Sequence, residues 1–375
     1  MVEIRFYPVG NGDSSQMILN NGKRLLFDYR HLASSEDDAN PEIDLKKELS
    51  KDLKEAKKNA FDVVAFSHAD RDHIQGSTDF FYLEHAKKYQ DGDRIKIDEL
   101  WVPAAMILEE GLEGEDRILR QEARHRLKIG DGIRVFSKPD KLKEWLKDNG
   151  LTLNDRKHLI TDAGETVPGY TLEADNVEFF VHSPYIKHID QNEEIARNES
   201  AIILHATFQV ENTESQYLLV GDSEWEVLED IVKITKYHKN NDRLKWDLFK
   251  APHHCSYKAL SDEKGDRKTI PKPDIQWLLD QGSNGCIIVS SSNPIGGDYK
   301  QKLPPHLQAA NCYKEAIEKN KGRKFIVTME SPNINSPKPI LVKVDKDGCW
   351  IKKTIAGAAA IISPSATKPS PRAGG

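Results

Sequence analysis

The chain has 375 residues, a length that suits one large domain or two small ones and suffices to bury a substantial core. Lysine and arginine number 54 against 60 aspartates and glutamates, so the formal net charge of −6 excludes a nonspecific nucleic-acid coat protein. Hydrophobic residues make up 38% and charged residues 30%, and no apolar run approaches the roughly 18 residues that a membrane span needs. We therefore expect a soluble globular protein with no membrane partner.

The first residues and the cysteines indicate a cellular compartment. The opening MVEIRFYPVG has a strand pattern and lacks the basic and apolar regions of a secretory signal. The four cysteines are widely spaced and form no CxxC motif, which argues against a disulfide framework and against a thiolate zinc site. Both features predict a cytoplasmic protein.

The first part of the chain predicts a strand meander, a helix and a buried strand. Strands are expected at residues 2–9, 15–19 and 24–28, and Asn21-Gly22 favours a hairpin between the last two. Apolar residues at helical spacing from Leu45 onward predict an amphipathic helix with a solvated, charged outer face. The run FDVVAF at residues 61–66 is typical of a strand buried on both faces.

Similar runs return after residue 200. They predict strands at 217–222, 246–254, 285–292 and 324–329, with helices around 227–234 and 306–319. Buried strands that alternate with amphipathic helices after a meander indicate a layered α/β sandwich. Residues 107–169 are highly charged, with helical stretches near 116–127 and 138–149. They fit this alternation poorly, so we expect an insertion packed over or beside the functional site.

The end of the chain differs in composition. Residues 363–375, SPSATKPSPRAGG, are rich in proline, serine, alanine and glycine and bury too little apolar area to order themselves. The sequence therefore predicts one domain over residues 1–362 and a disordered tail over 363–375.

The segment SHADRDHIQG, directly after the buried run, carries the strongest chemical signal. It places four potential metal ligands within six residues: His68, Asp70, Asp72 and His73. Imidazole together with carboxylate suits zinc, manganese or iron, and a divalent cation offsets the repulsion within such a cluster. Alternate residues of an extended loop point the same way and can share one ion, while Asp72 and His73 can address a second. The HxDxDH pattern therefore predicts a metal site.

This motif resembles that of the metallo-β-lactamase fold, in the form typical of the hydrolase domain of competence proteins that take up DNA. Further segments are similar in the same order along the chain: GNGDSSQMI, LLFDYR, ARNESAIIL, LLVGDSEWEVL, APHHCS and SSSNPIGG. The resemblance covers roughly residues 2–345. It implies a four-layer αββα sandwich with a charged helical insertion.

The resemblance also implies two divalent ions, zinc or manganese. Their implied ligands are His68, Asp70, Asp72, His73, His182, Asp222 and His253. Asp222 matches a bridging carboxylate, and His182 matches a histidine that the family supplies between these motifs. His253 and His254 compete for one coordination place; we favour His253 and expect His254 to orient a ligand or contact the substrate. Asp70 stands in place of a histidine of the family, and this oxygen ligand shifts the expected metal preference from zinc toward manganese.

Two bound ions lower the pKa of a bridging water to about 7, so hydroxide would be the nucleophile. We expect catalytic roles for Asp72, Asp222 and His254. The resemblance favours a phosphodiesterase or nuclease acting on DNA or RNA. Four residues are expected to contact this substrate: Asp13, Arg71, Lys258 and His306.

Two alternative functions remain open. Such a centre also opens lactones, thioesters and lactams, and a small-molecule hydrolase would have a deep closed pocket, whereas a nuclease needs an open groove lined by lysine or arginine. A noncatalytic, metal-stabilised interaction protein is less favoured because the ligand set is complete. The membrane helices of the competence proteins are absent from this sequence, so DNA uptake does not follow from the resemblance.

Overall fold

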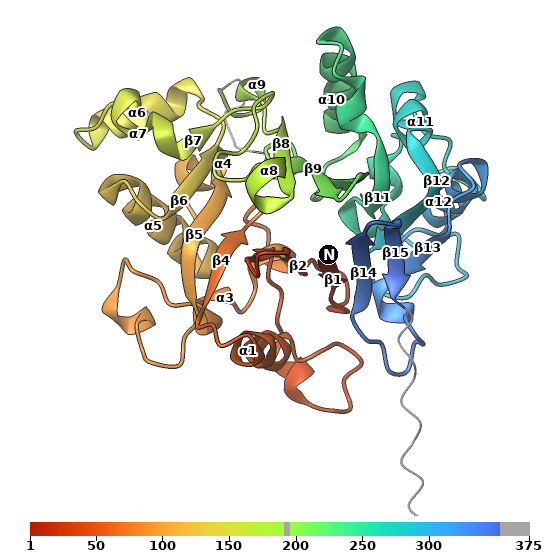
Figure 1. The fold of residues 1–375 in the computed structure, drawn as a ribbon, viewed down its shortest axis with the longest axis horizontal. Coiled ribbons are helices and arrows are strands. Elements are labelled where there is room, and N and C mark those ends of the chain that lie inside the picture. Colours follow the sequence, from red (N-terminus) through yellow and green to blue (C-terminus); the bar gives the residue numbers. More distant parts are fainter. Residues whose placement is uncertain (191–195, 353–375) are drawn as a thin grey trace, which may run out of the picture.

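The computed structural model describes residues 1–190 and 196–352, which form two β-sheets (Figure 1). The first sheet has nine strands in the order β15-β14-β1-β2-β3-β4-β5-β6-β7. Its strands are β1 (Val2–Phe6), β2 (Ser15–Ile18), β3 (Arg24–Phe27), β4 (Ala60–Ala65), β5 (Lys96–Pro103), β6 (Ile133–Phe136), β7 (Ile160–Thr161), β14 (Ile340–Asp345) and β15 (Gly348–Lys352). Pairing is antiparallel from β15 to β3 and parallel from β3 to β7.

The second sheet has six strands in the order β13-β12-β11-β10-β9-β8. They are β8 (Val177–Ser183), β9 (Ile203–Val210), β10 (Thr213–Leu219), β11 (Trp246–Ala251), β12 (Gly282–Ser290) and β13 (Lys324–Val327). An antiparallel pair of ladders, β8-β9-β10, is followed by parallel pairing from β10 to β13. Each sheet thus contains both antiparallel strands and a run of parallel strands.

The helices cover the outer faces of the two sheets (Figure 1). They are α1 (Leu45–Glu55), α2 (Arg71–Ile74), α3 (Ser77–Phe80), α4 (Ala104–Leu108), α5 (Gly114–Ile129), α6 (Asp140–Asp148), α7 (Leu153–Arg156), α8 (Leu172–Asp175), α9 (Ile186–Asp190), α10 (Trp225–Tyr237), α11 (Pro273–Leu279) and α12 (Leu307–Lys319). Short 3-10 helices lie in several connections.

Three separate hydrophobic cores define the layers. The first core lies between the first sheet and the helices α1, α4, α5 and α6. The second core fills the space between the sheets, and the third lies between the second sheet and the helices α10, α11 and α12. Burial of apolar area in these cores is the main favourable contribution to folding. The predicted four-layer αββα sandwich is therefore confirmed.

Residues 107–169 depart from the sequence expectation in one respect. The two expected helical stretches exist, as α5 and α6. However, the segment also supplies β6 and β7, which extend the parallel ladder beyond β5, so it continues the strand-helix alternation and is not an insertion outside it. Its strands are only four and two residues long, which is too short to give a clear apolar pattern in a charged segment.

The buried strand predicted at residues 61–66 is β4, whose neighbours β3 and β5 both pair in parallel. The sequence reading missed β5, β14 and β15. Only the family resemblance indicated β8 and β9, through His182 and the ARNESAIIL segment. The predicted tail, 363–375, and the last part of the predicted domain, 353–362, lie outside the described residues. Among the described helices, none combines the length and the hydropathy that crossing a membrane requires.

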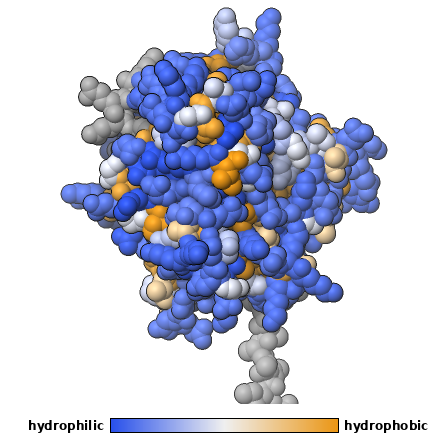
Figure 2. All heavy atoms as spheres, turned by 90° about the vertical axis from the view of Figure 1, so that its left-hand side faces the viewer, coloured by the Kyte–Doolittle hydropathy of each residue, from blue (hydrophilic) through white to orange (hydrophobic). Residues whose placement is uncertain are grey.

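The surface of the molecule on the side of α5 and α6 is predominantly hydrophilic. Figure 2 shows this side of the molecule, where hydrophobic residues form small separated groups among hydrophilic ones. The apolar side chains of α5 and α6, such as Leu119, Leu127 and Leu142, are buried against the sheet. This distribution agrees with the expectation that the charged helix faces are solvated.

Candidate metal centre

The candidate site lies where loops leave the ends of strands from both sheets. Asp72 and His73 follow β4 in the first sheet, whereas Asp222 follows β10 and His254 follows β11 in the second. The loop after β1 adds Asp13. Ligand sites of α/β proteins commonly form at the carboxyl ends of parallel strands, because the connecting loops converge there.

A glycine allows the β1 loop to approach the metal-motif loop. The backbone N–H of Asp13 donates to the carbonyl oxygen of Asp72 at 3.1 Å. A Cβ atom at Gly12 would lie 2.9 Å from that same oxygen, closer than real Cβ contacts allow. The glycine of the GNGD segment is therefore needed to bring Asp13 into the site.

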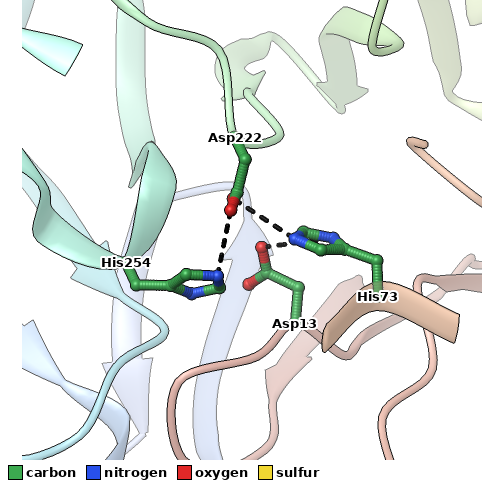
Figure 3. A group of neighbouring side chains, drawn as sticks. All are labelled: Asp13, His73, Asp222 and His254. Carbon is green, nitrogen blue, oxygen red and sulfur yellow. Dashed lines mark ion pairs between the residues drawn. The ribbon is translucent and has the colours of Figure 1, made fainter. Parts of the chain in front are cut away.

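Four buried side chains converge in the centre of the site: Asp13, His73, Asp222 and His254 (Figure 3). One ligand atom from each lies within 4.8 Å of the others. His254 Nε2 is 3.0 Å from Asp222 Oδ2 and 3.0 Å from Asp72 Oδ2, and His73 Nε2 is 3.3 Å from Asp222 Oδ1. Two histidines and three carboxylates, counting the half-exposed Asp72, thus surround a single point.

Several atoms in this cluster have no hydrogen-bond partner among the described residues. They are Asp13 Oδ1, His73 Nε2 and Asp222 Oδ1, all buried, and the neighbouring His68 Nε2 is in the same condition. His73 Nε2 and Asp222 Oδ1 face each other as an ion pair at 3.3 Å without forming a hydrogen bond. Buried polar atoms without hydrogen bonds are costly, so a cluster of them around one point suits a cation. Zinc bound at 2.0–2.1 Å in a tetrahedron separates its ligands by roughly 3.3 Å, which the distances above match. The donor set therefore fits a divalent ion.

Neighbouring groups orient both histidines toward the centre. His73 Nδ1 lies 2.9 Å from Asp28 Oδ2, and His254 Nδ1 lies 2.9 Å from the carbonyl oxygen of Ser291. These contacts assign the N–H of each ring to Nδ1 and leave Nε2 to coordinate an ion. Asp28 is itself held by the N–H and hydroxyl of Ser67. Asp28 belongs to the LLFDYR segment of the family resemblance, but the sequence did not give it this role.

The charges of the cluster interact strongly. Burial alone would lower the pKa of His254, but Asp222 and Asp72 raise it to about 10. Burial likewise opposes charge on His73, yet Asp222 and Asp28 raise its pKa well above the usual value. Burial would raise the pKa of Asp222, but His254 and His73 lower it well below the usual range. Without an ion, protonated histidines thus balance the carboxylates, a role that a divalent cation can take over.

The structure distinguishes the two adjacent histidines. His253 Nδ1 faces Glu224 at 3.8 Å, and its side chain is 21% exposed, away from the central cluster. Both residues have left-handed backbone conformations, with φ near 50°, as does Cys255 at 64°. This turn directs consecutive side chains differently, which the sequence could not show. The structure therefore places His254, and not the expected His253, in the cluster, and which of them binds an ion stays a prediction.

His182 is a second correction. It is fully buried, but its Nε2 lies 2.8 Å from the carbonyl oxygen of Arg243, and Thr235 lies beside its Nδ1 at 3.5 Å. Burial and the neighbouring His205 lower its pKa to about 3, so it is neutral. One ring nitrogen thus faces α10, through Thr235, and the other faces the 3-10 helix Asn241–Leu244, through Arg243. The structure therefore places His182 outside the metal cluster.

The remaining motif residues, His68 and Asp70, lie beside the cluster. His68 Nε2 is 3.4 Å from Asp70 Oδ2, and the His68 and His73 rings are 4.1 Å apart. Asp70 also forms an ion pair with Arg197 at 3.0 Å. Burial would raise the pKa of Asp70, but hydrogen bonds from His68 and Arg197 lower it below the usual range. Arg197 lies in the ARNESAIIL segment of the family resemblance, but the sequence assigned it no role in the site.

Lys250 is a further residue that the sequence reading missed. Its ammonium group is buried, forms an ion pair with Asp13 and donates to the carbonyl oxygen of Val220 at 3.0 Å. A lysine directly after the apolar pair Leu248 and Phe249 in the strand WDLFKA is a signal that would have identified it, because lysine is rarely buried without a partner. Asp13, expected to contact the substrate, is thus a member of the central cluster.

The other predicted substrate contacts differ in their surroundings. Arg71 is exposed, and Lys258 is exposed and 3.3 Å from Glu224. His306 is buried, with Nδ1 3.4 Å from the backbone N–H of Tyr257 and Nε2 3.2 Å from the carbonyl oxygen of Lys302. Because both ring nitrogens are used by backbone groups, His306 joins two loops and leaves no ring nitrogen for a substrate. The expectation for His306 is therefore corrected.

Comparison with known proteins gives the following. No protein-family model matches the sequence, and no curated protein matches it. Among solved structures, the chain is similar to the metallo-beta-lactamase GOB-18 from Elizabethkingia meningoseptica, with 10% identity and a TM-score of 0.29 over 74% of this chain and 87% of that one. It is also similar to the class B3 di-zinc metallo-beta-lactamase LRA-12 from an Alaskan soil metagenome, with 11% identity and a TM-score of 0.30 over 84% of this chain and 91% of that one.

A third similar structure is a diphosphatase from the PhnP family, with 10% identity and a TM-score of 0.25 over 67% of this chain and 73% of that one. At these TM-scores the similarities add nothing to the case for the fold, which rests on the two sheets and three cores. None of the comparisons bears on the competence proteins, and that resemblance stays a prediction.

Proposed function

We propose that this chain is a metal-dependent hydrolase that cleaves phosphodiester bonds. The observation that carries the proposal is the buried cluster of Asp13, His73, Asp222 and His254, whose unpartnered atoms share one point. Asp72, Asp222, His73 and His254 would hold the ion of this cluster, and His68 and Asp70 would hold the second, zinc or manganese in both places. Bound divalent ions lower the pKa of a coordinated water to about 7 and stabilise charge on a phosphoryl oxygen.

The side chains around the centre have distinct parts in this proposal. Asp222 is fully buried between His73 and His254, which suits a fixed structural carboxylate. Asp72 is 37% exposed and reaches the same histidine from the open side, so it is placed to orient a water molecule or accept its proton. His254 donates through Nδ1 to the carbonyl oxygen of Ser291, and its Nε2 contacts both Asp72 and Asp222, so it fixes the positions of the two carboxylates.

Charge around the opening favours a short substrate. The hollows that flank Arg197 are lined by carboxylates: Asp70, Glu199, Glu224 and Glu226 on one side, and Glu113, Glu115 and Asp116 on the other. Arg71 lines the second hollow, and Lys258 pairs with Glu224. A long polyanion would be repelled by such walls. DNA or RNA as substrate, our expectation from the resemblance, therefore requires few phosphate contacts.

The same observation favours one second candidate, hydrolysis of an uncharged lactone, thioester or lactam. The test is an assay of the purified chain, loaded with manganese or zinc, on bis-p-nitrophenyl phosphate, plasmid, single-stranded DNA, RNA, a lactone and a thioester. We expect metal-dependent cleavage of bis-p-nitrophenyl phosphate that Asp72→Ala and Asp222→Ala abolish, with Asp79→Ala, an exposed aspartate on α3, as the control. Cleavage of the lactone or thioester alone would establish the second candidate.

Substitutions of two basic residues test whether the chain cleaves nucleic acid. Arg71→Ala and Lys258→Ala should reduce oligonucleotide cleavage severalfold more than cleavage of bis-p-nitrophenyl phosphate, which has no flanking phosphates. The salt dependence should be shallow, with a slope of about −0.7 per phosphate contact on single strands. Equal losses on both substrates would show that these residues support the metal loops instead.

A further inference from the structure

Arg197 lies directly against one of the expected metal ligands. Its Nη1 donates to Asp70 Oδ1 at 3.0 Å and to the carbonyl oxygen of Ala69 at 2.9 Å. A guanidinium is permanently charged and presents its donors in a fixed plane. The carboxylate that the HxDxDH motif offers to an ion is therefore already paired with a cation.

Carboxylates from the other side keep Arg197 in place. Its Nε lies 2.9 Å from both oxygens of Glu109, and its Nη2 lies 3.0 Å from Asp116. Glu109 ends α4 and Asp116 lies in the first turn of α5, so the segment 107–169 anchors this arginine. The guanidinium is 22% exposed and uses donors on all three nitrogens. Withdrawal of the guanidinium from Asp70 would therefore disturb its contacts with Glu109 and Asp116 as well.

The position at His68 and Asp70 also has fewer donors than the central cluster. The third ligand expected there, His182, is bonded to Arg243 in another part of the structure. The central cluster, in contrast, gathers two imidazoles and two buried carboxylates within 4.8 Å, with Asp72 adjoining. The arginine contacts none of these five side chains among its recorded hydrogen bonds and ion pairs.

We infer that the two positions differ in their affinity for a divalent ion, and that Arg197 causes this difference. The central cluster holds one divalent ion tightly. An ion at His68 and Asp70 must displace the Asp70–Arg197 pair and meets the repulsion of the guanidinium, so this position is weak and exchangeable. Arg197 is thus a positioning residue that limits the second ion. The inference rests on the metal-binding part of the proposed function and not on the identity of the bond cleaved.

The test is a titration of the metal-free full chain with Mn²⁺, in which free ion is followed by electron paramagnetic resonance and bound ion by elemental analysis. For the wild type we expect one tight ion and either no second ion or one weaker by about 100-fold or more. Arg197→Gln should tighten the second ion by about tenfold or more and leave the first unchanged. Arg117→Gln, at an exposed arginine on α5 outside the site, should change neither.

Asp70→Asn provides a second measurement if Arg197→Gln does not fold. It should abolish the weak ion and preserve the tight one. Two equally tight ions in the wild type, or no gain of second-ion affinity in Arg197→Gln, would overturn the inference while leaving the proposed hydrolase intact. Loss of the tight ion in Asp70→Asn would also overturn it. A wild-type chain that binds no ion would overturn the proposed function as well.

Discussion

Asp72 Oδ2 lies 3.0 Å from His254 Nε2, although 182 residues separate the two along the chain. Asp72 follows β4 of the first sheet and His254 follows β11 of the second. The pair therefore spans the interface between the sheets, above the core that both sheets share. The candidate metal centre and the packing of the two sheets are consequently coupled.

This coupling predicts that metal binding stabilises the whole domain. An ion present at about 100 times its dissociation constant should raise the free energy of unfolding by about 2.7 kcal/mol, because it binds the folded state only. Asp222→Asn should abolish this gain, since it removes the carboxylate that contacts both His73 and His254. Thermal unfolding with and without Mn²⁺ or Zn²⁺ measures both effects. The exposed Asp79→Asn should keep the full gain, and an equal gain in Asp222→Asn would contradict the assignment.

The adjacent histidines should behave differently. His254→Ala removes the imidazole that contacts Asp72 and Asp222, so the tight ion should be lost. His253→Ala removes a ring that faces Glu224, so the ion should be retained. Elemental analysis of the two purified variants after dialysis against metal-free buffer decides between them. The reverse pattern would restore the original assignment to His253.

Lys250 should be essential to the stability of the metal-free protein. Lys250→Met leaves the buried Asp13 carboxylate without its partner, and breaking a buried ion pair in this way typically costs about 3–5 kcal/mol. Replacing both residues, in Lys250→Met with Asp13→Asn, should recover much of the loss because neither charge of this buried pair remains. Urea unfolding in the presence of a chelator measures these differences. Lys233→Met, at an exposed lysine on α10, should change stability by less than about 0.5 kcal/mol.

Two buried histidines outside the site predict a pH dependence of stability. Burial lowers the pKa of His182 to about 3 and that of His205 to about 4, from an ordinary value of 6.5. Below pH 6.5 the unfolded chain therefore binds protons that the folded chain does not, and stability falls as the pH falls. Between pH 7 and pH 5 each histidine should cost about 2 kcal/mol.

The variant His182→Gln should remove its share of this pH dependence, because glutamine does not titrate and retains a donor for the carbonyl oxygen of Arg243. Denaturant unfolding of metal-free protein at pH 5 and pH 7 measures the change. His238→Gln, at an exposed histidine, is the control and should leave the pH dependence as in the wild type. A pH dependence in His182→Gln identical to that of the wild type would show that His182 is not buried in neutral form.

The sequence by itself determined the layered architecture and most of the metal motif. Continuous apolar runs such as residues 61–66 reveal parallel strands, because both faces of these strands are covered. The HxDxDH loop is local, so its spacing alone brings His68, Asp70, Asp72 and His73 to one strand end. By contrast, β6 and β7 are too short for periodicity to reveal them, and the strands β5, β14 and β15 were missed.

Only the tertiary structure decided which distant side chains complete the site. His182 and His254 both follow or end strands, yet the ring of His182 turns to Arg243 whereas His254 reaches Asp72. The direction of the His254 side chain depends on the left-handed backbone angles at residues 253–255 and on the packing of one sheet against the other. The order of residues along the chain does not specify either. The same holds for Arg197 and Lys250, since the charge that each neutralises comes from a segment far away in the chain.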